Sequence, residues 1–177
     1  MTEETGVTEE TLAGEAPAVL TEDPVLAGLA GEFPNAGFEA ARGHDIARVG
    51  PAEVAGFVDA ARRAGFDYFL DLCAVDHLDR RPQRYEVVVN LVDPRRPVRL
   101  LVKVALEGPD PVMPSLTGVF PGANFYEREA FDLMGVRFEG HPDLTRILLP
   151  EEWEGHPLRK DAPVGSVPIQ FKESEAR

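Results

Sequence analysis

Residues 66–106 read FDYFLDLCAVDHLDRRPQRYEVVVNLVDPRRPVRLLVKVAL and contain three apolar runs separated by short polar linkers. The runs span residues 66–75, 84–92 and 98–106, and the second and third are rich in valine and leucine, as is typical of strands. Prolines interrupt both linkers. Linkers this short favour antiparallel hairpins over crossover connections. The stretch therefore predicts a small, mostly antiparallel sheet.

Helical patterns lie before and after this sheet in the sequence. Residues 24–33 start with a proline next to capping side chains, and residues 51–64 place apolar side chains on one face. A third helix is predicted over residues 125–134, with Asn124 as its capping residue. Helices packed beside a small antiparallel sheet define an α+β domain, which we assign to residues 21–135.

The two ends of the chain have a different character. Residues 1–20 are rich in Glu, Thr, Ala and Gly and contain no Lys or Arg, so we expect an acidic disordered tail. Residues 136–177 contain too many prolines for an ordinary helix, yet they also contain leucines, isoleucines and a tryptophan. Apolar side chains on such a segment need a surface to lie on. We therefore expect residues 136–177 to form an extended, proline-rich C-terminal arm that docks on partner proteins.

The composition of the 177 residues limits the classes of function. With 44% hydrophobic and 28% charged residues, we expect a soluble globular protein. A net charge of −13 argues against binding to nucleic acids or to anionic lipid surfaces. No stretch resembles a signal peptide or a membrane span, so we expect membrane association only through partners. The single cysteine, Cys73, cannot hold an iron–sulfur cluster alone, and we expect it to be a buried residue of a strand.

Glu127, Arg128, Glu129 and Asp132 form a charged group on the predicted third helix, which Gly135 is placed to end. Paired carboxylates can act as general acid and base. However, Arg128 and Asp132 are spaced to pair on one helix face, and an arginine among carboxylates would lower their pKa values and keep them ionised. The pattern therefore favours an ion-pair network, structural or at an interface, over catalysis.

Two Gly-His-Pro triplets contain His141 and His156, and Asp143 and Glu154 lie close to them in the sequence. Together these side chains could contribute to a metal site, but their spacing matches no common ligand arrangement. The proline after each histidine favours a rigid turn in which the imidazole bonds a backbone group. We expect no metal site.

The C-terminal arm also carries basic residues, Arg159 and Lys160, with Arg146 upstream. In an acidic chain they indicate salt bridges to carboxylates of a partner, with a solvated run of charges as the alternative. The sequence has no glycine-rich phosphate loop and no dinucleotide fingerprint. The residues alone thus indicate a compact domain with an ordered arm, and no active site.

The stretch 115–163 resembles the 30 kDa subunit family of respiratory complex I, whose bacterial members are known as the C subunit. The resemblance rests on the runs YEREAFDLMGV at 126–136, GHPDL at 140–144, RIL at 146–148 and GHPLRKD at 155–161. These runs agree with the family pattern in their order and spacing.

The resemblance implies an α+β subunit that has no catalytic residue and binds no flavin, cluster or metal of its own. It implies a place in the peripheral arm of a proton-translocating NADH:quinone oxidoreductase, which passes electrons from NADH through FMN and iron–sulfur clusters to quinone. The partners would be the large quinone-site subunit and neighbouring cluster-bearing subunits, on the cytoplasmic side of the cell membrane. The interface candidates that it implies are Glu127, Arg128, Glu129, Asp132, His141, Asp143, Arg146, His156, Arg159 and Lys160.

Two alternatives accompany this interpretation. A related membrane-bound nickel–iron hydrogenase or formate hydrogenlyase contains an equivalent subunit. An independent hydrolase that uses Glu127, Glu129 and His141 would be active as an isolated chain. Phe125 and Thr145 depart from the family pattern, where tryptophan and arginine are common.

Overall fold

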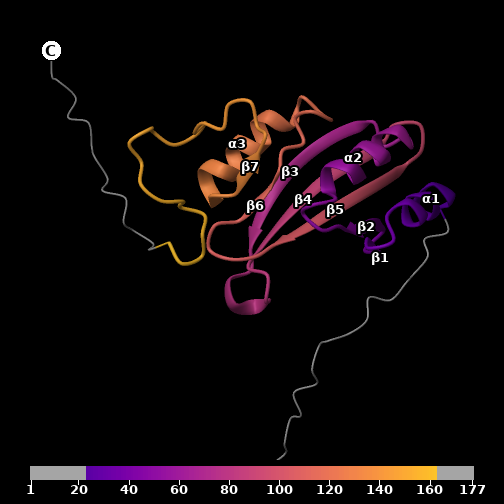
Figure 1. Ribbon diagram of the computed structural model, residues 1–177, viewed down its shortest axis with the longest axis horizontal. Helices are drawn as coiled ribbons and strands as arrows, with labels where there is room; N and C mark the ends of the chain where they lie inside the picture. Colours follow the sequence, from indigo (N-terminus) through magenta and orange to yellow (C-terminus); the bar gives the residue numbers. More distant parts are fainter. Residues whose placement is uncertain (1–22, 163–177) are drawn as a thin grey trace, which may run out of the picture.

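A five-stranded sheet forms the centre of the computed structural model, which describes residues 23–162 (Figure 1). The α-helices in this range are α1 (Pro24–Glu32), α2 (Val54–Arg63) and α3 (Ala123–Met134), with a short 3-10 turn, η1, at Leu78–Arg80. The strands in the same range are β1 (Gly37–Ala41), β2 (His44–Arg48), β3 (Tyr68–Asp76), β4 (Tyr85–Asp93), β5 (Val98–Leu106), β6 (Val112–Pro114) and β7 (Arg137–Glu139). The predicted tail at residues 1–20 and the C-terminal arm beyond residue 162 lie outside the described residues.

The strand order in the sheet is β1-β2-β5-β4-β3. Strands β3, β4 and β5 are antiparallel neighbours, as the short linkers predict, and Val89 of β4 lies between Val102 of β5 and Leu72 of β3. Strands β1 and β2 also pair antiparallel, whereas β2 joins β5 in parallel. A separate parallel pair consists of β6 and β7. The α+β fold with a mostly antiparallel sheet is therefore confirmed.

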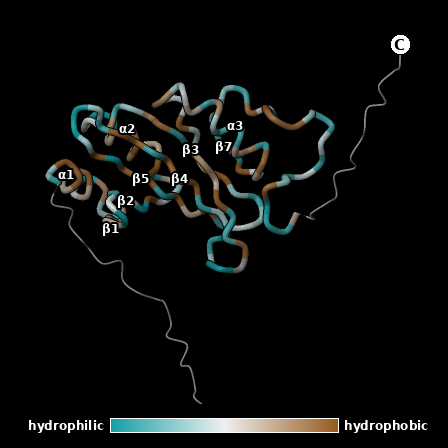
Figure 2. Tube along the Cα trace, turned by 180° about the vertical axis from the view of Figure 1, so that it is seen from behind, coloured by the Kyte–Doolittle hydropathy of each residue, from teal (hydrophilic) through white to brown (hydrophobic). Residues whose placement is uncertain are grey.

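The buried core lies on one face of this sheet. Along β4, Val87, Val89 and Leu91 are fully buried, whereas Val88 and Asn90 between them are partly exposed. This alternation is that of a strand with one covered face. Helix α2 overlies the sheet (Figure 1), and α1 and α2 both add buried side chains to the core. In Figure 2 many of the hydrophobic stretches of the chain lie along the strands.

The helix starts differ from the sequence-based expectation at two places. Helix α2 begins at Val54, because residues 51–53 form a turn that precedes it. Asn124 does not cap α3 but lies inside it. The chain enters α3 directly from a turn in which the Ala123 N–H donates to the Phe120 carbonyl (2.9 Å). Turn carbonyls thus replace the expected side-chain cap.

The expectation that Cys73 is buried was wrong, because this residue is exposed. Its neighbour Leu72 is buried on the covered face of the sheet, and successive side chains of a strand point to opposite faces. Cys73 lies opposite Val88 in the register of β3 and β4, on the less covered face.

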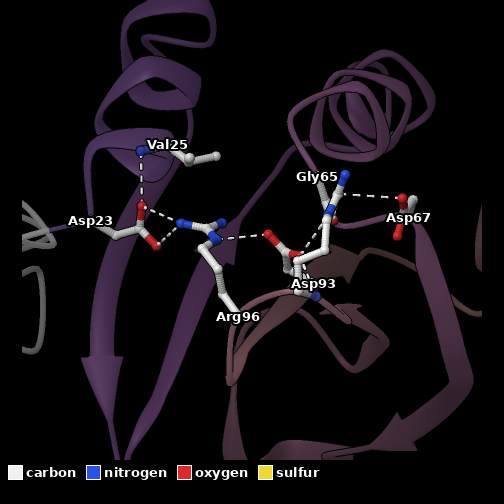
Figure 3. A network of polar contacts seen from close by, with 7 residues as sticks. Asp23, Val25, Gly65, Asp67, Asp93 and Arg96 are labelled. Atoms are coloured by element: carbon white, nitrogen blue, oxygen red, sulfur yellow. Dashed lines mark hydrogen bonds and ion pairs between the residues drawn. The ribbon is translucent and has the colours of Figure 1, made fainter.

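Ion pairs tie α1 to the turn between β4 and β5 (Figure 3). The Asp23 carboxylate caps α1 by accepting a hydrogen bond from the Val25 N–H (2.8 Å), and it also accepts two from Arg96 (3.1 and 3.0 Å). Arg96 donates further to Asp93 at the end of β4 (2.7 Å), which Arg95 contacts as well (3.2 Å). The hydrogen bond from Arg96 lowers the pKa of Asp93 to about 2. Asp93 is therefore ionised at neutral pH.

The start of the predicted C-terminal arm takes part in the fold. Strand β7 pairs with β6, and the chain described beyond it, to residue 162, runs in turns and bends without a helix or strand. Between residues 23 and 162 no helix combines the length and the apolar character that crossing a membrane requires.

Replacing Arg96 by alanine will destabilise the fold, because Asp23 and Asp93 would lose the cation that lies between them. We expect the midpoint of thermal unfolding at neutral pH to fall by roughly 5 °C. The matched control is Arg99→Ala, since Arg99 is an exposed residue of β5. Circular dichroism of the full chain during heating measures both variants, and equal midpoints would contradict a stabilising role for the network.

Candidate functional site

Asp132 on α3 is the buried carboxylate that fixes the C-terminal arm. Its side chain is fully buried, and Oδ2 accepts hydrogen bonds from three consecutive backbone N–H groups, those of Ile147 (3.1 Å), Leu148 (2.8 Å) and Leu149 (2.9 Å). Its Oδ1 accepts one from Arg146 Nη1 (2.7 Å). Backbone N–H groups outside helices and strands need partners of another kind. Here the Asp132 carboxylate is the acceptor for all three N–H groups.

The surroundings keep Asp132 charged. Burial by itself would raise the pKa of this carboxyl group, because it disfavours the ionised form. The hydrogen bonds from the three N–H groups and from Arg146 outweigh that effect and lower the pKa to about 2. Asp132 is therefore an anion at neutral pH, and its hydrogen bonds are charge-assisted.

Arg146 closes a short loop in the arm. Besides Asp132, its guanidinium group donates to the backbone carbonyls of Trp153 (2.9 Å) and Gly155 (3.2 Å). A single side chain thus joins both ends of residues 146–155 to α3. We call residues 146–155 the pinned loop.

The next part of the arm covers the carbonyl end of α3. Arg159 Nε donates to the Met134 carbonyl (2.8 Å), and His156 Nδ1 donates to the Asp132 carbonyl (2.9 Å). Because a carbonyl only accepts, His156 carries a proton on Nδ1. The last carbonyls of a helix have no partner within it, and a cation is favourable at this end. The arm therefore caps α3.

Gly135 makes this approach possible. Its φ of 75° is left-handed, a conformation that glycine adopts without strain. A Cβ atom at this position would collide with the Arg159 guanidinium group and the His156 ring. The end of α3 and the path of the arm thus depend on the same glycine.

A second buried carboxylate, Asp76 at the end of β3, ties the arm to the sheet. It accepts hydrogen bonds from Arg84 Nε (3.0 Å) and Nη2 (2.9 Å), and from the Lys160 N–H (2.8 Å). Arg84 reaches on to Asp161 with Nη1 (2.9 Å). The hydrogen bonds from Arg84 hold the pKa of Asp76 well below its usual range. The arm is therefore fixed at two separate elements of the domain.

Glu127 is a third buried carboxylate, turned toward the β6–α3 connection. Its Oε1 accepts from the Leu116 N–H (2.6 Å) and its Oε2 from Ser115 Oγ (2.7 Å). His141 Nε2 lies 4.0 Å from Oε2. On the other side of the ring, His141 Nδ1 accepts a hydrogen bond from the Asp143 backbone N–H (3.0 Å). Burial raises the pKa of Glu127.

The expected pair between Arg128 and Asp132 does not form. Arg128 donates to the Thr145 carbonyl and hydroxyl (both 3.1 Å) and to the Arg146 carbonyl (3.0 Å). The two side chains of α3 bind different points of the arm. The expected lowering of the carboxyl pKa is confirmed for Asp132, although the arginine that contributes to it is Arg146. The same expectation was wrong for Glu127, because burial raises the pKa of that group.

The structure divides the ten interface candidates into two groups. Seven of them form hydrogen bonds inside the chain with their side chains: Glu127, Arg128, Asp132, His141, Arg146, His156 and Arg159. Glu129, Asp143 and Lys160 form no side-chain hydrogen bond with the residues that the structure describes. Contact of any of the ten with a partner stays a prediction.

Sequence reasoning assigned no role to Asp76 or Arg84, and it considered Ser115 only as the cap of a brief helical turn. A signal for Asp76 and Arg84 was available, since Asp76 directly follows one predicted strand region and Arg84 opens the next. Pairing of the hairpin brings them together, with Asp76 opposite Tyr85 in the register. No comparable local signal exists for Ser115, which meets Glu127 only through the tertiary fold.

Two hollows in the described part of the chain lie away from the buried carboxylates. A cavity of about 140 Å³ between β3 and α3 is lined by Cys73, Glu129, Leu133 and Leu158 among others. An open hollow of about 670 Å³ lies at the loop around residues 78–84. Neither includes Glu127, Asp132 or His141. Within residues 23–162 no three His, Cys, Asp or Glu side chains gather in a possible metal site.

Comparison with known protein families shows which family this chain is similar to. The family model described as respiratory-chain NADH dehydrogenase, 30 kDa subunit, matches residues 46–167, which include α3 and the pinned loop. The chain therefore belongs to the 30 kDa subunit family. The C subunit of the NADH-quinone oxidoreductase of Roseiflexus castenholzii is 42% identical over 158 residues, covering 86% of this chain and 90% of that protein. The resemblance found in the sequence is confirmed.

Two solved structures share this fold. A trypsin-resistant fragment of Nqo5 matches with a TM-score of 0.60 at 30% identity, covering 68% of this chain and 96% of that one. The membrane-bound sulfane sulfur reductase, an archaeal respiratory membrane complex, matches with a TM-score of 0.71, covering 86% of this chain and 96% of that one. At 22% identity, this second match shows a shared fold alone.

Replacing Asp132 by asparagine will loosen the pinned loop, because the three N–H groups and Arg146 would lose their anionic partner. We expect amide hydrogen exchange at residues 147–149 to be faster by about tenfold or more, which corresponds to about 1.4 kcal/mol. Mass spectrometry on the full chain measures this exchange. The control is Asp143→Asn, since Asp143 is exposed. Equal exchange in the two variants would rule out the anchoring role.

Asp132 also predicts a dependence of stability on pH. Its pKa is lowered from 3.8 to about 2 in the folded chain, so its contribution is complete above the unfolded value and is lost as the pH falls through the folded one. Urea unfolding of the wild type and of Asp132→Asn should therefore give free energies whose difference narrows between about pH 4 and about pH 2. A difference that stays constant over this range would refute the prediction.

Proposed function

We propose that this chain is a cofactor-free accessory subunit in the peripheral arm of a proton-translocating NADH:quinone oxidoreductase, respiratory complex I. The complex carries electrons from NADH through FMN and iron–sulfur clusters to quinone, and this chain contributes no redox group. Its part is to hold the subunits of the quinone-site module in register. Membership of the 30 kDa subunit family supports the assignment to the complex.

One observation carries the structural role, namely the fixed shape of a C-terminal arm that has no helix or strand between residues 140 and 162. The Asp132 carboxylate and the Arg146 guanidinium group hold it. A segment already fixed in shape loses little conformational entropy when it binds, which favours association. The arm also exposes Leu148 and Leu158, whose burial against a partner would be favourable.

The partners in this proposal are the large quinone-site subunit and the neighbouring cluster-bearing subunits. Their contact would place the chain on the cytoplasmic side of the cell membrane as a peripheral subunit. The sequence supports a role without a cluster, because a cluster held by thiolates needs several cysteines and this chain has one, Cys73.

A second candidate is the equivalent subunit of a related membrane-bound complex, such as a nickel–iron hydrogenase. This second candidate is supported by the fold that the chain shares with an archaeal respiratory membrane complex. An independent hydrolase is not favoured, because Glu127 is fully buried and lies outside both described cavities.

Affinity purification of the tagged full chain from gently solubilised host membranes tests the proposal. We expect flavin- and cluster-bearing subunits to co-purify and the preparation to oxidise NADH with a quinone acceptor. Hydrogen uptake or release without NADH oxidation would support the second candidate. A monomer without partners would contradict both.

The same purification tests the role of the arm through Arg146→Ala. Loss of the Arg146 guanidinium group removes its hydrogen bonds to Asp132, Trp153 and Gly155. Each of these contributes about 1 kcal/mol or more to the stability of the pinned loop. We expect roughly tenfold less assembled complex, and a matching fall in NADH:quinone activity per unit of membrane protein. The matched control is Arg137→Ala, because Arg137 is an exposed arginine of β7. Wild-type assembly of the Arg146 variant would contradict the docking role.

A further inference from the structure

The two arginines of the arm, Arg146 and Arg159, form hydrogen bonds within the chain. Arg146 bonds Asp132 and two backbone carbonyls, and Arg159 bonds the carbonyl of Met134. Arg159 also lies over the ring of Tyr85, 5.4 Å from its centre. Both guanidinium groups therefore have partners inside the chain. Asp132 of this chain is thus the carboxylate that Arg146 meets in the structure, and contact of Arg146, Arg159 or Lys160 with another protein stays a prediction.

The pinned loop has two large apolar side chains at its surface. Leu148 is 61% exposed and Ile147 is 37% exposed, although their backbone N–H groups are bonded to buried Asp132. The backbone of the loop is thus fixed while these side chains remain in water. Adjacent apolar side chains exposed at the surface and rimmed by polar residues are a feature of protein interaction sites.

The same loop carries an unbalanced negative charge. Glu151, Glu152 and Glu154 are exposed, and none forms an ion pair with another residue of the described range 23–162. The loop has one basic residue, Arg146, and Asp132 neutralises it at 2.7 Å. The loop therefore presents leucine and isoleucine side chains beside three glutamates.

We propose that the pinned loop docks into an apolar recess bordered by lysine or arginine side chains on another subunit of the complex. The proposal rests on the proposed function and adds the chemistry of the contact surface. Opposite charges around an apolar contact steer association and reject wrong partners. The recess would bury Leu148 and Ile147, and its basic border would face the glutamates.

The negative charge of the pinned loop favours a basic protein surface over a second copy of this chain or an anionic lipid surface. A second copy of this chain would bring the same three glutamates to the contact, and like charges disfavour it. An anionic lipid surface would repel the loop as well. A basic protein surface is the partner that the loop attracts.

Charge variants of the full chain, expressed in the host and recovered with tagged complex, test the sign of the contact. We expect Glu151→Lys/Glu152→Lys to reduce co-purified subunits by roughly tenfold and Glu151→Gln/Glu152→Gln to reduce them less. The matched control is Glu107→Lys/Asp110→Lys, which changes two exposed acidic residues after β5 by the same charge. A loop that merely lost its fold would not separate lysine from glutamine.

A photo-crosslinking residue in place of Leu148 identifies the surface that is touched. Attachment to a stretch of another subunit that has apolar residues flanked by Lys or Arg, together with the loss in the lysine variant, supports the proposal. It is overturned if the lysine variant assembles like its control, or if the attachment is to lipid, to a second copy or to an acidic surface. Failure of the wild type to recover any other subunit would instead reject the proposed function itself.

Discussion

The shape of the C-terminal arm depends on one carboxylate, Asp132, that meets four donors in the interior of the protein. A buried donor without a partner destabilises a fold by about 1–3 kcal/mol, and a buried charge without one does so by more. Moving the arm away would leave Asp132 without its donors and three N–H groups without their acceptor. Helix α3 and the pinned loop therefore form one unit, although the loop itself has no regular structure.

The rest of the domain supports this unit from the sheet. The hairpin of β3 and β4 brings Asp76 and Arg84 together, and their pair also binds the Lys160 N–H and Asp161. The arm is thus held at α3 and again at the edge of the sheet. Two anchors on different elements fix its position as well as its local shape. A docking segment placed by the core in this way does not depend on its own propensity for order.

Much of the fold was predictable because it follows from local patterns. The valine-rich runs predicted β4 and β5, and the short linkers predicted their hairpin connections. Gly135 ends α3, as its position predicted. The roles of Asp132 and Arg128 were not predictable from their four-residue spacing, because donors and acceptors of the arm compete for both side chains. Spacing along a helix reports which groups are near, whereas the tertiary fold decides which of them bind.

In this arm the charged residues that hold it against the domain differ from those that would contact a partner. The arginines that sequence reasoning assigned to a partner are bonded within the chain, and this leaves the glutamates of the pinned loop as its outward charges. Ionised Asp132, with its pKa near 2, keeps Arg146 in place across the physiological range of pH. The internal pair sets the shape of the loop, and the exposed glutamates set its electrostatic sign. A fixed loop with a defined sign can discriminate between partners even when the apolar area it offers is small.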